Sequence, residues 1–270
     1  MAKTPISYYG GKQNLVSTIL PILQVPHARY VEAFVGGGAV FWAKRPSALE
    51  SINDLDDRVI NFYRVCQARF DELNDRVQST LHSESVYRLA GKILKEAKAD
   101  EVAFAWAFWV QTNMSFGHKL FAGFRFAQDH DEAQTTHNSK QKFTTLLSER
   151  LASVEIFSRD ALSVIALKDA KDTLFYLDPP YVSSDCGHYK GYTRANWEEL
   201  LHTLTTIKGK FVLSSYPEPE LAELLAGQVW HQHQIQQAIG VTGKKAGKVK
   251  TEVITSNFLP VTKRQQSLFA

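Results

Sequence analysis

An acid, two prolines and an aromatic ring follow one another directly after an apolar run, as Asp178, Pro179, Pro180 and Tyr181. The prolines end the run and stiffen the backbone, so the acid and the ring are held at a fixed separation. Asp178 can accept one hydrogen of an exocyclic amine, and the Pro179 carbonyl can accept the other. The amine lone pair is then free to attack, while Tyr181 can stack on the base that carries it. This tetrad predicts group transfer to the amine of a planar base.

A glycine-rich turn, Gly36–Gly38, lies between the apolar run 29–34 and a helical pattern at 39–44. Glycine lets the backbone approach a ligand closely, because it has no Cβ and tolerates positive φ. The next apolar run leads to Asp54, an acid placed to accept hydrogen bonds from ribose hydroxyls. The spacing is not GxGxxG and no phosphate-binding Lys-Ser/Thr pair follows. The turn therefore favours a nucleoside cofactor without phosphates, with a structural turn or an NAD-binding turn as alternatives.

A second candidate for cofactor binding lies upstream, where Tyr8 and Lys12 flank a glycine pair. An aromatic ring and a lysine in this order can cover a ligand and neutralise its carboxylate. An ordinary loop before a helix is the alternative.

The elements that must position these residues alternate between strands and helices. The predicted strands are Arg29–Phe34, Leu49–Ile52, Val154–Phe157, Thr173–Leu177, Lys210–Ser214, Val229–Gln234 and Glu252–Ser256. The helices predicted among them are Gln13–Ile22, Ala39–Lys44, Trp197–Thr206 and Pro219–Leu225. This alternation predicts an α/β fold with helices on both faces of the sheet.

The segment between the second and third predicted strands differs from the rest of the chain, because its apolar residues mostly recur at helical spacing. It contains the helical patterns Ile60–Arg69, Phe70–Leu81, Ser85–Glu96 and Glu101–Val110, followed by a predicted loop from Thr112 to Asn138. We therefore predict a catalytic α/β domain formed by residues 1–58 and 150–270, interrupted by a mainly helical insert at 59–149.

The composition bounds the class of protein. The 270 residues are 44% hydrophobic and 22% charged, which suits a folded domain with a sizeable core. The formal charge of +3 does not by itself indicate a polyanionic partner. Two distant cysteines, Cys66 and Cys186, predict neither a disulfide framework nor a CxxC metal site, as in a reducing cytosol. No apolar run is long enough to span a membrane.

Taken in order, the motifs resemble those of the Dam-like (D12) class of DNA adenine-N6 methyltransferases. The resemblance covers most of the chain outside the helical insert. The matching segments are Tyr8–Lys12, Glu32–Phe41, Asn53-Asp54, Asp160, Asp178–Tyr181, Gly209–Tyr216 and Lys250–Asn257. A fixed order of several motifs is far more specific than any one of them.

The resemblance implies a Rossmann-like S-adenosylmethionine-dependent methyltransferase fold with a mixed seven-stranded sheet, no metal, and a helical insert that recognises the target. It implies double-stranded DNA as the partner, with no membrane and no obligate protein partner. The implied location is the cytoplasm of a prokaryotic or phage-infected cell. The target adenine would be flipped out of the duplex. The implied cofactor-binding residues are Tyr8, Lys12, Glu32, Phe34, Gly36, Gly38, Asp54, Asp160 and Asp178, and the implied catalytic residues are Asp178, Pro179, Pro180 and Tyr181.

Two segments are candidates for DNA binding. In the insert, Asn113 can read adenine, Arg125 can read guanine edges, and Lys119 adds a positive charge. Near the end of the chain, Lys244, Lys245 and Lys248 resemble a hairpin tip that contacts phosphates. The alternatives are a structural core for the first segment and a solvated turn for the second.

One departure from the family pattern bears on the recognition sequence. Relatives that methylate GATC usually carry lysine where this chain has Ser7, so GATC is not assumed and a different or relaxed site is plausible. The alternatives for the activity are a cytosine-N4 methyltransferase, a glutamine or RNA methyltransferase, and a catalytically silent DNA-binding protein. An aspartate at the start of the tetrad favours adenine.

Overall fold

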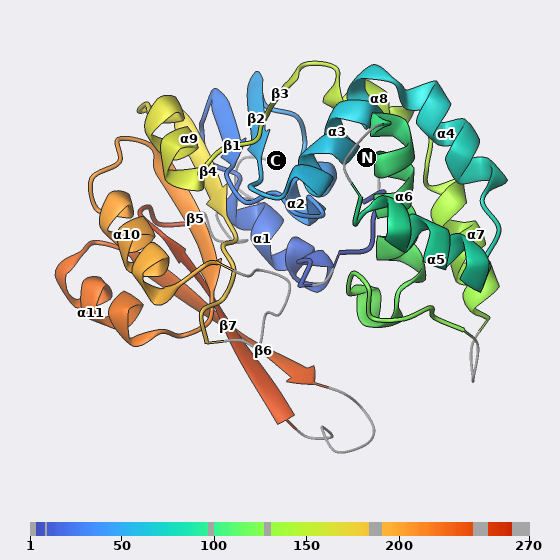
Figure 1. The fold of residues 1–270 in the computed structure, drawn as a ribbon. Coiled ribbons are helices and arrows are strands. Elements are labelled where there is room, and N and C mark those ends of the chain that lie inside the picture. Colours follow the sequence, from blue (N-terminus) through green and yellow to red (C-terminus); the bar gives the residue numbers. More distant parts are fainter. Residues whose placement is uncertain are drawn as a thin grey trace. The chain divides into compact units, whose positions relative to one another are not determined.

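The structure of the chain is a computed structural model that describes residues 4–8, 10–96, 100–126, 131–183, 191–239 and 248–260 (Figure 1). For residues 237–239 and 248–249 it describes the backbone alone. The chain divides into two compact units, one formed by Met1–Val16 and Val35–Asp160 and the other by Ser17–Phe34 and Ala161–Ala270.

The described strands follow the order β3-β2-β1-β4-β5-β7-β6 in a mixed seven-stranded sheet, which confirms the predicted sheet. Parallel pairing joins β2 to β3, β1 to β4 and β4 to β5. β7 runs antiparallel to both β5 and β6. The strands are β1 (Arg29–Glu32), β2 (Leu49–Asn53), β3 (Val154–Phe157), β4 (Thr173–Leu177), β5 (Lys210–Ser215), β6 (His231–Ile239) and β7 (Lys248–Ser256).

The helices follow the same chain order. They are α1 (Val16–Ile22), α2 (Ala39–Ala43), α3 (Asp57–Ala68), α4 (Phe70–Ser79), α5 (Glu84–Ile93), α6 (Glu101–Met114), α7 (Glu132–Gln141), α8 (Leu146–Leu151), α9 (Ala161–Lys168), α10 (Arg194–Leu204) and α11 (Pro219–Gly227). Short 3₁₀ helices, η1 (Gln13–Leu15) and η2 (Phe116–His118), precede α1 and follow α6.

The first unit is built largely from helices α3 to α8, which lie between β2 and β3 along the chain. α6 has buried residues on every face, so it is the central helix of this unit. Asp100 caps α6 by accepting hydrogen bonds from the backbone of Val102 at 2.9 Å and of Ala103 at 3.1 Å. Aromatic rings fill the core, among them the stacked pair Phe70 and Phe143 with centroids 5.4 Å apart.

The second unit is organised by β4, in which all five residues are buried, and by β5, which is buried along most of its length. Near-continuous apolar sequence is typical of parallel strands that are covered on both faces. Figure 1 shows α9 and α10 beside these strands and α11 next to α10. α10 begins with a capping box between Thr193 and Asn196, and α11 begins at Pro219, so the chain turns sharply into both helices.

The predicted loop from Thr112 to Asn138 is partly wrong, because α6 continues to Met114 and α7 begins inside the predicted loop. The only buried residue within α7 is Thr136, so this helix has no apolar periodicity that a sequence could reveal. Asp131 starts α7 by accepting a hydrogen bond from the backbone N–H of Gln134 at 2.8 Å. An N-terminal cap, rather than an apolar face, was therefore the available signal.

Candidate active site

The glycine turn lies in the first unit and is tied to the end of β2. The backbone N–H of Val35 donates to the Asn53 carbonyl at 2.8 Å, and the Gly36 N–H donates to the Asp54 carboxylate at 2.8 Å. Gly36 has φ +46° and Gly38 has φ +65°, the left-handed region that favours glycine. The turn and Asp54, which the sequence predicts as parts of one site, therefore come together.

Tyr8 packs directly on this turn. A Cβ added to Gly37 would lie 2.7 Å from the Tyr8 Cβ, and one added to Gly36 would lie 3.2 Å from the Tyr8 ring. The Tyr63 hydroxyl donates to the Gly36 carbonyl at 3.1 Å. Larger side chains at Gly36 or Gly37 would displace Tyr8, so packing within the turn requires glycine there. The positive φ angles of Gly36 and Gly38 are a second reason for glycine in this turn.

Lys12 is buried, with 8% of its surface exposed, and its ammonium donates to the Gly10 carbonyl at 3.2 Å. A mostly buried ammonium next to a glycine loop is a chemically suitable partner for a ligand carboxylate. The contact with Gly10 also shows how Lys12 is held in place.

The hydrogen bonds and the pKa of Asp54 are unusual for a residue that is partly exposed. Its two oxygens accept the backbone N–H groups of Gly36 at 2.8 Å and of Asp56 at 2.9 Å. Burial of the carboxyl group raises the pKa of Asp54 from 3.8 to about 6, although the two N–H groups act in the opposite direction. Near neutral pH the group is an anion that is poorly solvated, which suits an acceptor of ribose hydroxyls.

Asn53 is a positioning residue that the sequence prediction did not single out. Its side-chain amide donates to the Arg159 carbonyl at 3.0 Å and accepts the Arg159 N–H at 2.9 Å. Asn53 thereby fixes the segment after β3, including the exposed Asp160, to the end of β2. An asparagine that ends a buried strand is the sequence signal that could have indicated this role.

Glu32 and Phe34 belong to the second unit. Glu32 is buried at the end of β1 and accepts a hydrogen bond from the Tyr30 hydroxyl at 2.6 Å. Phe34 is half-buried and meets Tyr192 edge to face, with ring centroids 6.1 Å apart.

The tetrad begins directly after β4, and Asp178 and Tyr181 are only partly exposed. Burial, together with the charges of Asp178 and Glu252, raises the pKa of Tyr181 well above its ordinary value. The tyrosine therefore remains a neutral hydrogen-bond donor at any physiological pH. Its ring lies 4.4 Å from that of Tyr216, at an interplanar angle of 63°.

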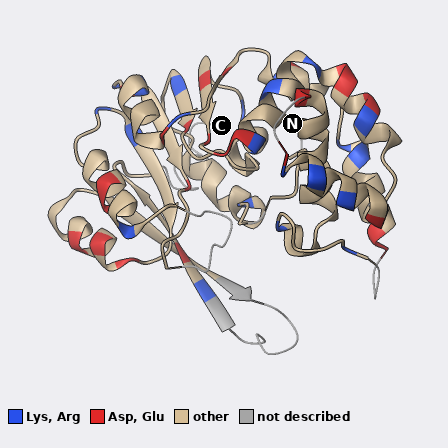
Figure 2. Ribbon diagram, in the orientation of Figure 1, with Lys and Arg blue, Asp and Glu red and all other residues tan. Residues whose placement is uncertain are grey.

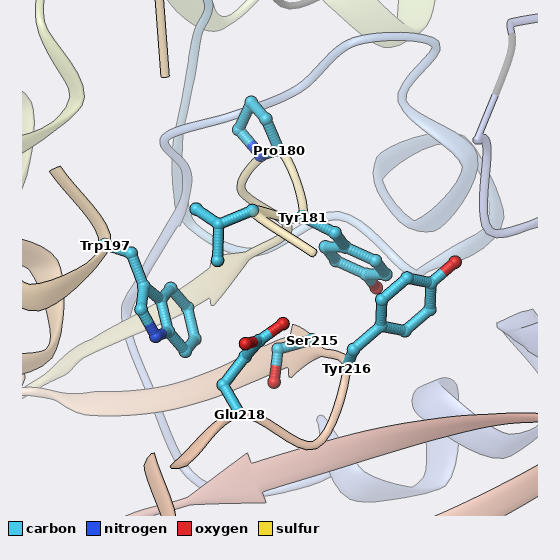
Figure 3. Close-up of a pocket in the computed structure, with 7 residues that line it drawn as sticks. Pro180, Tyr181, Trp197, Ser215, Tyr216 and Glu218 are labelled. Atoms are coloured by element: carbon cyan, nitrogen blue, oxygen red, sulfur yellow. The ribbon is translucent and has the colours of Figure 1, made fainter. Parts of the chain in front are cut away.

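A small, shallow hollow adjoins the tetrad, and we call it the tetrad hollow. Figure 3 shows Trp197 on one side, Tyr181 and Tyr216 on the other, and the Glu218 carboxylate between them. The Ser183 hydroxyl donates to Glu218, which fixes the chain just after the tetrad. The residues that line the hollow are Pro180, Tyr181, Val182, Trp197, Ser215, Tyr216 and Glu218.

The predicted DNA-reading residues of the insert are held by contacts within the first unit. Asn113 is buried, donates to the Trp109 carbonyl at 3.0 Å and accepts the Ser7 hydroxyl at 3.3 Å. Arg125 pairs with Glu132 at 2.8 Å, with 14% of its side chain exposed, and donates to the Asn113 carbonyl at 2.9 Å. Base reading by Arg125 would require its ion pair with Glu132 to open. Lys119 is half-buried.

Three predicted site features fall partly or wholly outside the described residues. Lys244 and Lys245 lie beyond them, and of Lys248 only the backbone is described. Within the described parts of the chain, no three His, Cys, Asp or Glu side chains gather in a way that could hold a metal ion. No helix in those parts is long and apolar enough to cross a membrane.

Comparison with known proteins gives matches along most of the chain. A sequence model of the family described as D12 class N6 adenine-specific DNA methyltransferase matches residues 8–231. The type II methyltransferase M1.LlaDCHI of Lactococcus lactis subsp. cremoris is 25% identical over 269 residues, covering 92% of this chain and 93% of that protein.

Solved structures give weaker matches. A precorrin 8W decarboxylase from Methanobacterium thermoautotrophicum is 9% identical, covering 96% of this chain and 100% of that chain, with a TM-score of 0.43. A SAM-dependent methyltransferase from Agrobacterium tumefaciens is 12% identical, covering 90% of this chain and 59% of that chain, with a TM-score of 0.39. Scores this low carry no argument, so the functional conclusion depends on the family match.

Proposed function

Because this chain belongs to the D12 class of N6 adenine-specific DNA methyltransferases, we propose roles for its residues in moving a methyl group from S-adenosylmethionine to adenine N6. The observation that carries these roles is the intact Asp178–Tyr181 tetrad at the carboxyl end of the buried strand β4. In α/β sheets this end of the strands is where ligands bind.

The acceptor side of the reaction is assigned to the tetrad. The Asp178 carboxylate and the Pro179 carbonyl each accept one hydrogen of the adenine amine, which directs the nitrogen lone pair away from them. Pro180 stiffens the turn, and Tyr181 stacks on the base. As the new N–C bond forms and the methyl–sulfur bond breaks with its electron pair left on sulfur, N6 would gain positive charge. The Asp178 carboxylate would stabilise that charge until one N6 proton passes to solvent. Such orientation and charge stabilisation are typically worth about 10²–10³ in rate.

The cofactor side is assigned to the glycine turn and its neighbours. Bound S-adenosylmethionine supplies an electrophilic methyl carbon on a sulfonium. The donor set fits this cofactor, because Lys12 offers an ammonium for its carboxylate and Asp54 offers an anion for its ribose hydroxyls. The residues assigned to this side are Tyr8, Lys12, Glu32, Phe34, Gly36, Gly38, Asp54 and Asp160.

We assign target recognition to the helical insert, residues 59–149, and catalysis to residues 1–58 and 150–270. Helices α3 to α8 support this division, since they separate β2 from β3. Lys119, Asn113 and Arg125 stay as proposed DNA contacts. Asn113 could make its contact only if its buried amide becomes exposed, and Arg125 only if its pair with Glu132 opens. The adenine is flipped out of double-stranded DNA at a cost of a few kcal/mol. We propose the cytoplasm of a prokaryotic or phage-infected cell as its location, because the proposed DNA substrate would be found there.

The deciding experiment incubates unmethylated genomic DNA with the protein and S-adenosylmethionine. Nucleosides are then measured by mass spectrometry, and modified sites are mapped by long-read sequencing. We expect N6-methyladenine at a defined sequence and none with Asp178→Ala. Finding N4-methylcytosine alone would favour the cytosine alternative, and cofactor binding without any methylation would favour a silent DNA-binding protein.

A further inference from the structure

Four side chains are joined in one cluster that includes Tyr181 of the tetrad. Tyr181 follows β4, Tyr216 follows β5, and Lys250 and Glu252 lie on β7. The last paired residues of β5 and β7 are Ser215 and Val253, and Tyr216 and Glu252 come one position beyond them. The residues matched by the family model end at 231, so β7 lies outside that match.

Glu252 connects the cluster. Its side chain is 5% exposed, and its carboxylate pairs with the Lys250 ammonium at 2.8 Å. The second carboxylate oxygen accepts the Tyr181 hydroxyl at 3.4 Å, a long hydrogen bond. A buried carboxylate without a cation would be strongly unfavourable, so the position of Glu252 depends on Lys250.

Lys250 in turn lies over both rings. Its ammonium is 4.6 Å from the centroid of Tyr216 and 5.9 Å from that of Tyr181, distances at which a cation is attracted to an aromatic face. Burial alone would lower the pKa of Lys250, but hydrogen bonds to Glu252 and Tyr216 raise it above its ordinary value. Lys250 therefore stays charged. The Tyr181 side chain is held by two contacts, one between its hydroxyl and Glu252 and one between its ring face and Lys250.

We propose that Lys250 and Glu252 are positioning residues that fix the ring of Tyr181, packed against Tyr216, in the orientation needed to stack on the target base. This inference rests on the proposed role of Tyr181. Neither residue touches the reacting atoms in this assignment. Both act by restricting the motion of Tyr181, which would otherwise have to be ordered each time a base enters.

The test combines a rate with a direct report of stacking. Single-turnover methylation is measured at saturating cofactor and DNA, and 2-aminopurine at the target position reports stacking by its fluorescence. For Glu252→Ala we expect a rate at least about tenfold lower, brighter 2-aminopurine and an unchanged cofactor dissociation constant. Lys250→Met should change both readouts in the same direction. Glu252→Gln keeps an acceptor for Tyr181 and should recover part of the rate. Gln236→Ala, an exposed change on β6, is the matched control and should match the wild type.

A double-mutant cycle separates positioning from general destabilisation. If Glu252 acts through the tyrosine hydroxyl, Glu252→Ala should cost much less in a Tyr181→Phe background than in the wild type. The inference is overturned if the two substitutions reduce the rate by independent factors that multiply in the double mutant. It is also overturned if Glu252→Ala leaves the rate unchanged. If Glu252→Ala does not fold, the same cycle is run with Glu252→Met, which removes the acceptor for Tyr181 but keeps most of the side-chain volume. Tyr181→Ala tests the premise separately, because full activity of that variant would refute the stacking role itself and not merely its positioning.

Discussion

Two acids, Asp54 and Asp178, each follow a buried strand, but their surroundings differ. Asp54 accepts two backbone N–H groups, so its oxygens are oriented by the main chain. Asp178 has the Tyr181 hydroxyl nearby, and its charge helps to raise the pKa of that tyrosine. An acid whose oxygens are fixed by the main chain is suited to binding a ribose. An acid that is followed by two prolines and an aromatic ring is suited to orienting an amine.

The first prediction concerns Asp178. Replacing it with alanine removes the acceptor that orients the amine and stabilises its developing charge, so the rate of methyl transfer should fall by about 10²–10³ or more. Cofactor binding, measured by isothermal titration calorimetry, should stay close to the wild-type value. Full turnover of Asp178→Ala would show that the carboxylate has no such role.

The second prediction concerns the affinity for the cofactor. Asp54→Ala removes charged hydrogen bonds to the ribose and should weaken binding by about 1–3 kcal/mol. The dissociation constant from calorimetry is the measurement, with Asp57→Ala as an exposed acidic control at the start of α3. The ribose assignment does not survive if the two variants bind the cofactor equally well.

The third prediction follows from the pKa of Asp54, which burial raises to about 6 in the folded protein. Between its ordinary pKa and this value, the folded state binds more protons than the unfolded state. The free energy of unfolding contributed by this group should therefore fall as pH rises from about 4 to about 6, by about 1–3 kcal/mol. Urea unfolding of wild type and Asp54→Asn at pH 4.5 and pH 7 measures it. The stability of the wild type relative to Asp54→Asn should be lower at pH 7. A stability difference between the two proteins that does not change with pH would contradict the raised pKa of Asp54.

At the scale of elements, the sequence predicted strands better than it predicted the helices of the insert. β3 and β4 have their predicted bounds, because turn residues at both ends of a short apolar run define where the strand begins and ends. α7 was missed because its sequence is polar all round, and only its capping aspartate distinguishes it from a loop. β6 extends to Ile239 through a glutamine-rich stretch that pairs with β7, and such pairing cannot be read from one strand alone.

The same limit applies to the candidate site. The glycine turn and Asp54 could be predicted to lie together, because the ends of adjacent strands carry them. The contacts of Asn53 with Arg159, and of Glu252 with Tyr181, join residues that are 106 and 71 positions apart. Side-chain contacts over such distances depend on tertiary packing, which leaves no periodic signal in the sequence.

The fourth prediction uses two glycines with nearly equal backbone angles. Gly38 has φ +65° and Gly117 has φ +60°, so alanine at either position meets the same left-handed strain. At Gly38 the added Cβ would also lie 2.6 Å from the Tyr63 hydroxyl, whereas nothing lies within 4 Å at Gly117. Denaturant unfolding should therefore show Gly38→Ala to be about 1–3 kcal/mol less stable than Gly117→Ala. Equal losses would mean that Tyr63 moves aside at little cost.

At the scale of the whole molecule, charge is nearly balanced. The chain has 31 basic and 28 acidic residues, and Figure 2 shows the two kinds interspersed along the described helices of the insert. A balanced surface does not attract DNA over long distances, so the affinity for phosphates has to come from local groups. The segment from Lys244 to Lys250, which includes the start of β7, is the strongest concentration of positive charge in the sequence.

The last prediction tests that segment as a phosphate contact. Changing Lys244, Lys245 and Lys248 together to alanine should weaken binding to all DNA sequences alike. It should also reduce the slope of log affinity against log salt by about 2–3, since each lost phosphate contact contributes about 0.9. The control removes the same charge outside the insert, at Arg45, Lys171 and Lys208, which are exposed, and should leave the slope nearly unchanged. Equal losses in both variants would assign the effect to overall charge. A shift in sequence preference would show instead that these lysines read bases, because phosphate contacts carry no sequence information.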